Sequence, residues 1–224
     1  MFVVGLFKGD TMRSLIALTG FRGCGKNFYY DQIFKNWELQ EENSLFPKTI
    51  KFKNFAFADF LKEYCSRLYG FTLEEIEKYK RDKTKTIRIR NKRYTMREIL
   101  VRTANTLRRI SHDGIWAELA IKHINNWLKE NEKEDEFIIP VITDLRFKTE
   151  LDLLKSNFKT LIIYIESECK DCQENIGNKD ELEIFDLRIN SDIEEILPCY
   201  KEFTHEDKEK LRLQIHNKIQ TLIK

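Results

Sequence analysis

The sequence predicts a three-layer α/β/α fold, in which helices cover both faces of a parallel β-sheet. Short apolar runs without polar alternation, at 14–20, 137–145 and 160–166, are typical of strands buried on both faces. Segments with helical spacing of their apolar residues lie between these runs, and this alternation favours a parallel sheet. The chain of 224 residues, 42% hydrophobic and 34% charged, suits one large soluble domain, alone or with a lid or insertion.

The strands differ in how clearly the sequence marks them. SLIALTG (14–20) comes first and leads into a glycine-rich turn. FIIPVITDL (137–145) and TLIIYIE (160–166) are the other two clear runs. KTIKFKNFAF (48–57) and EIFDLRI (183–189) are weaker candidates. Five strands are therefore expected.

Helix signals stand between the strands. Gly70 ends one helical pattern, as glycine commonly does. Thr95 precedes another, and Glu98 three positions later completes a capping-box pattern. Thr204 is a plausible cap for the last helix. The expected helices cover 58–70, 95–110, 113–130 and 204–224.

Bulk composition narrows the function classes. The net charge of +2 is too balanced to indicate a polyanionic partner by itself. The five cysteines are odd in number and scattered, which is typical of a reducing cytoplasm. The pair Cys169 and Cys172 has the spacing of half a zinc site, but no second pair or nearby histidine completes it. The apolar start before Lys8 is too short for a signal or a membrane span, so we expect no membrane partner.

GFRGCGKN (20–27) follows the first strand and precedes a helix, the context in which a phosphate-binding loop has meaning. Glycines let the backbone bring N–H groups close to phosphate oxygens, and Lys26 can reach the β- and γ-phosphates. The alternative is an ordinary tight turn with a stray lysine. We expect ATP to contact Gly20, Arg22, Gly23, Cys24, Gly25, Lys26 and Asn27, with Arg22 and Lys26 in catalytic roles.

Asn27 departs from the generic loop pattern, which has serine or threonine there to help hold Mg²⁺. An amide oxygen still accepts hydrogen bonds and can face the water shell of a metal, but it carries no charge. Another carboxylate is therefore expected to serve Mg²⁺.

VITDLRFKTE (141–150) supplies that carboxylate, because Asp144 ends an apolar strand and ligands bind at the carboxyl ends of parallel strands. Asp144 is the expected Mg²⁺ residue, through water, and Arg146 is expected to face a phosphate. Both are candidate catalytic and substrate-binding residues. The alternative is that Asp144 caps the following helix and Arg146 pairs with Glu150.

Basic residues between the strands suggest a second anion site. A phosphoryl-transfer enzyme must hold donor and acceptor in line, and Lys62, Arg97 and Arg109 are candidates for the acceptor. Plain surface charge is the alternative for each of them. The basic run at 78–97 fits either a flexible acceptor-side segment or a nucleic-acid patch, and near-neutral net charge favours the first.

Four motifs in order resemble those of the deoxynucleoside monophosphate kinases of bacteriophages, a branch of the P-loop nucleoside monophosphate kinases. The loop and VITDLRFKTE are the most specific, FAFADFLKEYCSRLYG (55–70) and TMREILVRTANTLRRISHDGIWAE (95–118) less so. The resemblance covers most of residues 14–190. It carries over the following functional positions: Lys62, Arg97, Arg109, Trp116, Asp144, Arg146 and Glu150.

The resemblance implies an ATP- and Mg²⁺-dependent kinase that phosphorylates a deoxynucleoside monophosphate. It implies one P-loop kinase domain over 1–224, with five parallel strands in the order 2-3-1-4-5. The core would span about 14–57 and 136–224, the acceptor-binding helices about 58–130 and the lid about 166–183. It also makes a homodimer reasonable, with no stable nucleic-acid partner, in the cytoplasm (of the host, for a viral source).

This chain departs from the family pattern in three places. Ala104 and Asn105 stand where the family often has Gly-Thr, and Asn27 stands where it often has Asp. No lid arginine can be assigned, and Lys170 and Lys179 are only candidates. The alternatives are a kinase similar to the animal phosphomevalonate kinases, which share a similar loop, or a binding protein without kinase activity.

Overall fold

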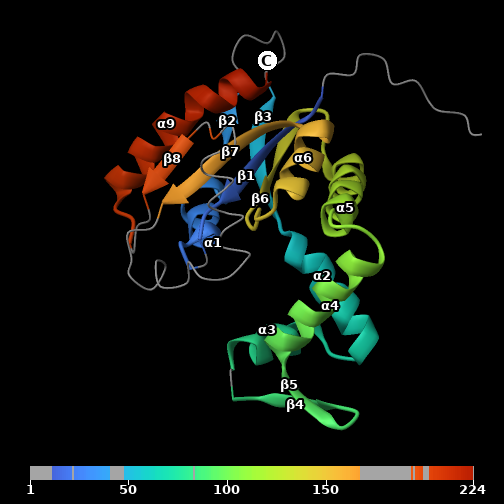
Figure 1. Cartoon of the computed structure of the whole chain (residues 1–224). Coiled ribbons are helices and arrows are strands. Elements are labelled where there is room, and N and C mark those ends of the chain that lie inside the picture. Colours follow the sequence, from blue (N-terminus) through green and yellow to red (C-terminus); the bar gives the residue numbers. More distant parts are fainter. Residues whose placement is uncertain are drawn as a thin grey trace, which may run out of the picture.

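A computed structural model describes residues 12–21, 23–40, 48–82, 84–166, 193, 195–198 and 202–223. These residues form a central sheet between two helical layers, and a group of helices with a small hairpin extends beyond one edge of the sheet (Figure 1). The predicted lid at 166–183, the weak strand at 183–189 and Cys169, Cys172 and Cys199 lie almost wholly or wholly outside the described residues.

The sheet confirms the predicted fold class. Its strand order is β2-β3-β6-β1-β7-β8, and every neighbouring pair is parallel except β2 with β3. The five parallel strands, counted along the chain, have the order 2-3-1-4-5. The short antiparallel β2 is an addition that the sequence analysis did not predict. The strands are β1 (Ser14–Thr19), β2 (Leu39–Gln40), β3 (Thr49–Phe55), β6 (Glu136–Ile142), β7 (Lys159–Glu166) and β8 (Glu195–Pro198).

Strand β1 lies at the centre and is buried on both faces, which explains its run of apolar residues without alternation. Leu15 and Ala17 belong to one core cluster, with α5 (Ile115–Asn131) and α6 (Lys148–Asn157). Ile16 and Leu18 belong to the other. That second cluster holds α1 (Lys26–Tyr29), the π-helical turn η1 (Tyr30–Phe34) and α9 (His205–Ile223).

The helices beyond the sheet edge have a small core of their own, built from Cys65, Ile76, Met96 and Leu100. They form one crossover between the neighbouring strands β3 and β6, because α2 follows β3 and α5 leads back to β6. The elements are α2 (Phe57–Tyr69), α3 (Leu73–Arg81), β4 (Thr86–Ile89), β5 (Lys92–Thr95) and α4 (Met96–Ile110).

Local signals set most helix ends as expected. Gly70 ends α2 in the left-handed region, at φ 74°. The Thr95 hydroxyl accepts from the Glu98 N–H, and the Glu98 carboxylate accepts from the Thr95 N–H, which forms the predicted capping box of α4. Thr204 and Asp207 make a matching pair of bonds at the start of α9.

Two segments differ from expectation. The basic run at 78–97, described except at position 83, forms the end of α3, the β4–β5 hairpin and the first residues of α4, none of which was predicted within it except the start of α4. Ile87 packs against the small core and so holds the hairpin to the helices. The fifth parallel strand is β8, a four-residue segment too short to stand out from its surroundings in the sequence. None of the described helices is long and apolar enough to cross a membrane.

Candidate functional site

The glycine-rich loop has the backbone that phosphate binding requires. Gly20, Gly23 and Gly25 have φ values of 137°, 86° and 84°, a region that side chains with a Cβ rarely adopt. A Cβ on Gly20 would stand 2.5 Å from the carbonyl oxygen of Ile165 and 2.9 Å from the Cys24 sulfur. The loop therefore passes close against β7, and glycine is needed there for space as well as for φ.

Lys26 lies within the curve of this loop. Its ammonium donates to the carbonyl oxygens of Gly20 and Phe21, at 2.7 and 3.0 Å. Helix α1 begins at Lys26 and continues into η1, so the loop lies at a helix N-terminus as predicted. Asn27 is exposed at the second position of this helix, and Cys24 is buried beneath the loop. Arg22 lies outside the described residues.

The loop and Asp144 follow neighbouring strands, because β1 pairs with β6. The Thr19 hydroxyl donates to the carbonyl oxygen of Leu145 at 3.0 Å, a buried bond that ties the two strand ends together. The predicted nucleotide loop and the predicted carboxylate are thus at the same edge of the sheet, where ligands bind in open parallel sheets.

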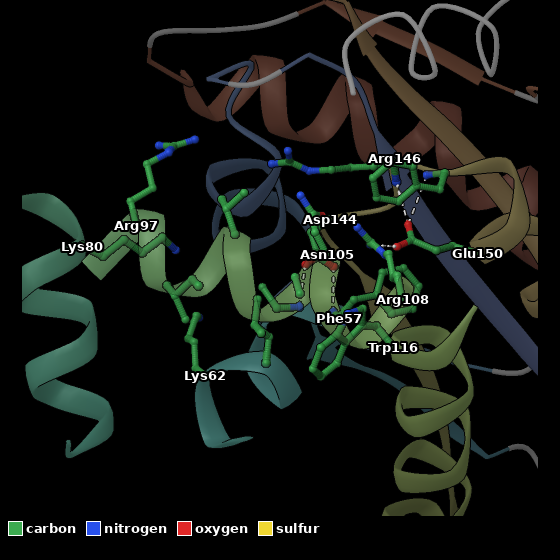
Figure 2. A pocket seen from close by; sticks show the side chains of 16 residues that line it. Phe57, Lys62, Lys80, Arg97, Asn105, Arg108, Trp116, Asp144, Arg146 and Glu150 are labelled. Carbon is green, nitrogen blue, oxygen red and sulfur yellow. Dashed lines mark hydrogen bonds and ion pairs between the residues drawn. The ribbon is translucent and has the colours of Figure 1, made fainter. Parts of the chain in front are cut away.

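A cavity of about 300 Å³ opens beside this edge, between the sheet and the helices of the crossover. Figure 2 shows Lys80 and Arg97 at one end, Arg108, Trp116 and Glu150 at the other, and Asp144 and Asn105 between them. The labelled side chains come from α2, α3, α4, α5, the loop after β6 and α6. They are Phe57, Lys62, Lys80, Arg97, Asn105, Arg108, Trp116, Asp144, Arg146 and Glu150.

One end of the cavity is cationic. Lys62 pairs with Asp59 and Glu77 at 2.8 Å each; burial opposes its charge, but these pairs leave its pKa above the ordinary value. The pKa of Lys80 is lowered by burial and by the charges of Lys62 and Arg97. Gathering like charges in this way raises the local potential and favours an anionic ligand.

Asp144 holds the start of α2. Its carboxylate accepts from the main-chain N–H groups of Phe57 and Ala58, at 2.8 and 2.9 Å. The alternative that Asp144 caps the following helix is therefore wrong, because it caps a helix that begins 87 residues earlier. Burial raises the pKa of Asp144, and the two N–H groups oppose this rise.

Glu150 caps α6 instead. The carboxylate accepts from the main-chain N–H groups of Arg146 and Phe147, at 3.1 Å each, and from Nη2 of Arg108 at 3.2 Å. Only 2% of Glu150 is exposed. Burial and the charge of Asp144 raise its pKa to about 7. The main-chain N–H of Arg146, not the predicted guanidinium, is what pairs with Glu150.

The arginine that α4 turns toward the cavity is Arg108, and the expected Arg109 is exposed on another face. Arg108 follows Arg97 by eleven positions, close to three turns at about 3.6 residues per turn, so the two share a face. Arg109 is one position further round. Helical phase alone would have placed Arg108, and not Arg109, on the face of α4 that carries Arg97.

Several of the residues predicted for the site line the cavity, and other lining residues were not predicted. Lys62, Arg97, Trp116, Asp144 and Arg146 all line the cavity. The missed lining residues include Lys80, on a helix that was not predicted, and Phe147, whose ring lies 4.2 Å from the Arg108 guanidinium. Basic charge near 80 was the only sequence signal for Lys80.

One carboxylate of the cavity, Asp144, fits a metal that is bound mainly by a phosphate ligand and by water. Within the described residues, no three His, Cys, Asp or Glu side chains gather as a metal-binding cluster. Mg²⁺ commonly uses one or two carboxylates together with phosphates and water, and Asp144 suits that mode. Asn27 offers an amide oxygen, which carries no charge. Lys170 and Lys179, the lid candidates, lie outside the described residues.

The comparisons with known proteins assign no chemistry to the residues described above. No protein-family model matches the sequence, and no curated protein matches it. Among solved structures, the chain is similar to the dephospho-CoA kinase from Campylobacter jejuni, with a TM-score of 0.43 and 14% identity over 93% of this chain and 97% of that one. Shikimate kinase from Bacteroides thetaiotaomicron has a TM-score of 0.35 and 10% identity over 94% and 99% of the two chains. A sugar kinase from Janibacter sp. HTCC2649 has a TM-score of 0.37 and 11% identity over 95% of this chain and 99% of that one.

Proposed function

We propose that this chain is an ATP- and Mg²⁺-dependent kinase that converts a deoxynucleoside 5′-monophosphate to the diphosphate. The observation that carries the proposal is that two groups of residues suited to bind anions lie at one edge of the sheet. One is the glycine loop around Lys26, and the other is the cationic end of the cavity beside Asp144. Transfer between two phosphate groups needs both to be held together and in line.

The loop suits the triphosphate of ATP. Its three glycines have φ values above zero, and a Cβ at Gly20 would collide with β7, so its backbone can approach phosphate oxygens closely. Lys26 already donates to two carbonyl oxygens there, and phosphate oxygens are stronger acceptors for the same ammonium. The N-terminus of the helix formed by α1 and η1 adds partial positive charge.

Asp144 is the residue that would hold Mg²⁺ through water. Each of its oxygens accepts one main-chain N–H and keeps a lone pair for a further contact. When bound, Mg²⁺ would neutralise negative charge on the phosphoryl group in transfer.

The cavity suits a monophosphate with a ring attached. Lys62, Lys80 and Arg97 stand at one end as partners for the phosphate, with Arg146 also on the lining. The opposite end has the aromatic rings of Trp116 and Phe147, which suit a planar base. These residues position the acceptor and screen its charge while the chemistry occurs.

A coupled assay of ADP release tests the proposal. ATP and Mg²⁺ are supplied with dTMP, dGMP, dCMP or dAMP in turn, then with the ribonucleotides. We expect ADP release that depends on one or more deoxynucleotides and on Mg²⁺. Absence of turnover with every nucleotide would overturn the proposal, and turnover with phosphomevalonate alone would favour the rival small-molecule kinase.

A binding protein without kinase activity is the second candidate, and the β4–β5 hairpin favours it. Arg88 and Arg93 stand directly opposite each other on this hairpin, a like-charge pair that an anionic partner would relieve. A salt titration of oligonucleotide binding separates the candidates, because phosphate contacts weaken steeply with salt. Absence of binding at low salt would remove this candidate.

A further inference from the structure

Glu77 joins two of the lysines at the cationic end of the cavity. Its carboxylate lies 2.8 Å from the ammonium of Lys62 on α2, and 4.0 Å from that of Lys80, three residues further along α3. Both lysines line the cavity, and Glu77 is not among the residues that line it. Glu77 therefore contacts these cations without occupying the cavity.

The cationic end needs negative charge when no ligand is bound. Lys62, Lys80 and Arg97 all line it, and Figure 2 shows them on the same side of the cavity. Like charges gathered in this way repel one another and oppose folding. Asp59 and Glu77 both pair with Lys62, so three positive charges stand against two negative charges. The carboxylates thus stabilise the empty arrangement, and a net charge of +1 is left for a ligand.

Glu77 is the carboxylate that bridges two helices. Asp59 lies on the same helix as Lys62 and its side chain is 53% exposed, whereas Glu77 comes from α3 and is 39% exposed. The Lys62 side chain is only 17% exposed, so its pair with Glu77 is less screened by water than an ordinary surface pair. Removing the charge of Glu77 should therefore change the potential at the cavity wall.

We propose that Glu77 is a resident counter-charge, which stabilises the cationic end while the cavity is empty and opposes the binding of a phosphate group there. Both effects have one electrostatic origin, because a carboxylate that attracts the lysines repels an incoming anion. Glu77 acts through Lys62 and Lys80, so it is a positioning residue. The inference rests on the part of the proposed function that places a phosphate group at this end, and it does not depend on phosphoryl transfer.

This arrangement exchanges affinity for a site that is ready before the ligand arrives. With Glu77 in place, Lys62 keeps a partner when the anion leaves, and a half-buried charge is not left unpaired. The expected cost is weaker binding than the three cations could provide alone. Stability of the empty protein and affinity for phosphate should therefore respond in opposite directions to the loss of this one carboxylate.

Glu77→Gln tests the proposal, because it removes the charge and keeps the size of the side chain. Glu74→Gln is the matched control, since Glu74 is exposed on the same helix, three residues earlier, and does not line the cavity. The parent chain and both variants also carry Lys26→Ala, so that the glycine loop does not hold the probe. The probe is inorganic phosphate, at an ionic strength kept constant with sodium chloride. Thermal unfolding with and without phosphate is measured together with the Kd from calorimetry.

Without phosphate, we expect Glu77→Gln to melt at a lower temperature than the parent chain, because the lysines lose a partner. With phosphate, we expect it to be stabilised more than the parent, with a Kd lower by about threefold or more. Glu74→Gln should match the parent in both measurements. A purely structural role for Glu77 would also lower the melting temperature, but phosphate binding would then be unchanged or weaker, and either result would overturn the proposal.

The remaining outcomes separate this inference from the proposed function. Tighter phosphate binding by Glu77→Gln, in a protein whose unmodified form turns over no nucleotide, would leave the inference standing and overturn the kinase. An unchanged melting temperature without phosphate would overturn the stabilising role of Glu77. No binding of phosphate by any of the three chains would overturn the inference together with the acceptor site.

Discussion

The glycine loop and the cavity are built in opposite ways. The loop is a continuous stretch of eight residues, and its parts are set by local geometry: glycines with positive φ, a lysine and a helix start. The cavity collects its lining from helices and loops that span residues 57 to 150. The loop is thus built from residues adjacent in the sequence, and the cavity from residues far apart in it.

This difference decides which changes each region tolerates. A substitution in the loop affects one function directly, because loop residues such as Lys26 contact mainly their own neighbours. A substitution in the cavity also affects packing, because Asp144 and Glu150 hold helix ends as well as lining the wall. Function and stability are therefore separable at Lys26, although not at Gly20 or Cys24, which pack against β7 and in the core, and they are joined in the cavity.

Lys26→Ala is the strongest test of the loop as a separable part. We expect turnover to fall about 100-fold or more, because a charge on the transferred group loses its partner. The melting temperature should change little, since Lys26 is only partly buried and bonds within its own loop. Unchanged turnover would show that the loop is not the site.

Arg108→Ala and Arg109→Ala form a matched pair for the cavity. Arg108 lines the wall and pairs with buried Glu150, so we expect its loss to raise KM for the acceptor about tenfold or more and to lower stability. Arg109 is exposed, and its loss should leave both quantities nearly unchanged. Steady-state kinetics and thermal unfolding measure the two effects, and the reverse ranking would restore Arg109 to the site.

Glu150→Gln tests how a cavity residue contributes to stability. The pKa of Glu150 is raised to about 7, so the folded chain keeps a proton that the unfolded chain releases near 4.5. Stability contributed by this proton is present at low pH and falls as pH rises from about 4.5 to about 7, by about 3 kcal/mol in all.

The glutamine variant cannot ionise, so it should lose this part of the pH dependence. We expect the difference in unfolding free energy, variant minus unmodified protein, to increase as the pH is raised from 5 to 8, as measured by denaturant unfolding. Glu130→Gln, at an exposed position, is the control and should show no such gain. A difference of equal size at pH 5 and at pH 8 would contradict the raised pKa of Glu150 as the source of this pH dependence.

Asn27→Asp is the mildest test and concerns the loop again. Asn27 is exposed, and the two side chains are nearly the same shape, so folding should be unaffected. The added charge should maintain Mg²⁺-dependent turnover or improve it a few-fold. A change of that size corresponds to the interaction free energy of about one exposed pair of opposite charges. Turnover measured across Mg²⁺ concentrations checks this, and loss of activity in a folded variant would contradict the placement of the metal.

The sequence predicted what is local or periodic. The strand at 14–20 and the helix at 95–110 were recognised because burial on two faces and a capping box leave marks on adjacent residues. The order of the parallel strands also followed, through the family resemblance. The strand, glycine turn and helix start of the loop agree with the prediction at the described positions, and its contacts with ATP stay a prediction.

Contacts over long sequence distances could not be predicted in the same way. Nothing in the residues around Asp144 indicates that its carboxylate caps α2, because that contact depends on where the start of α2 packs relative to the end of β6. Lys80 was missed for the same reason, and β8 because four residues carry too little pattern. Arg108 could have been predicted to line the cavity in place of Arg109, since helical phase alone separates the two.

The crossover between β3 and β6 also has a consequence for evolution and design. Its two ends are fixed by strands that pair directly with each other, through seven register positions from Thr49 with Glu136 to Phe55 with Ile142. The sheet therefore places few demands on what lies between them, and chain length costs little in closure entropy. Helices α2 to α4 are nevertheless tied to the sheet, because Phe57 and Ala104 belong to the core cluster beside it and the start of α2 offers two N–H groups to Asp144. A segment of different sequence could replace them only if it kept this packing and these two bonds.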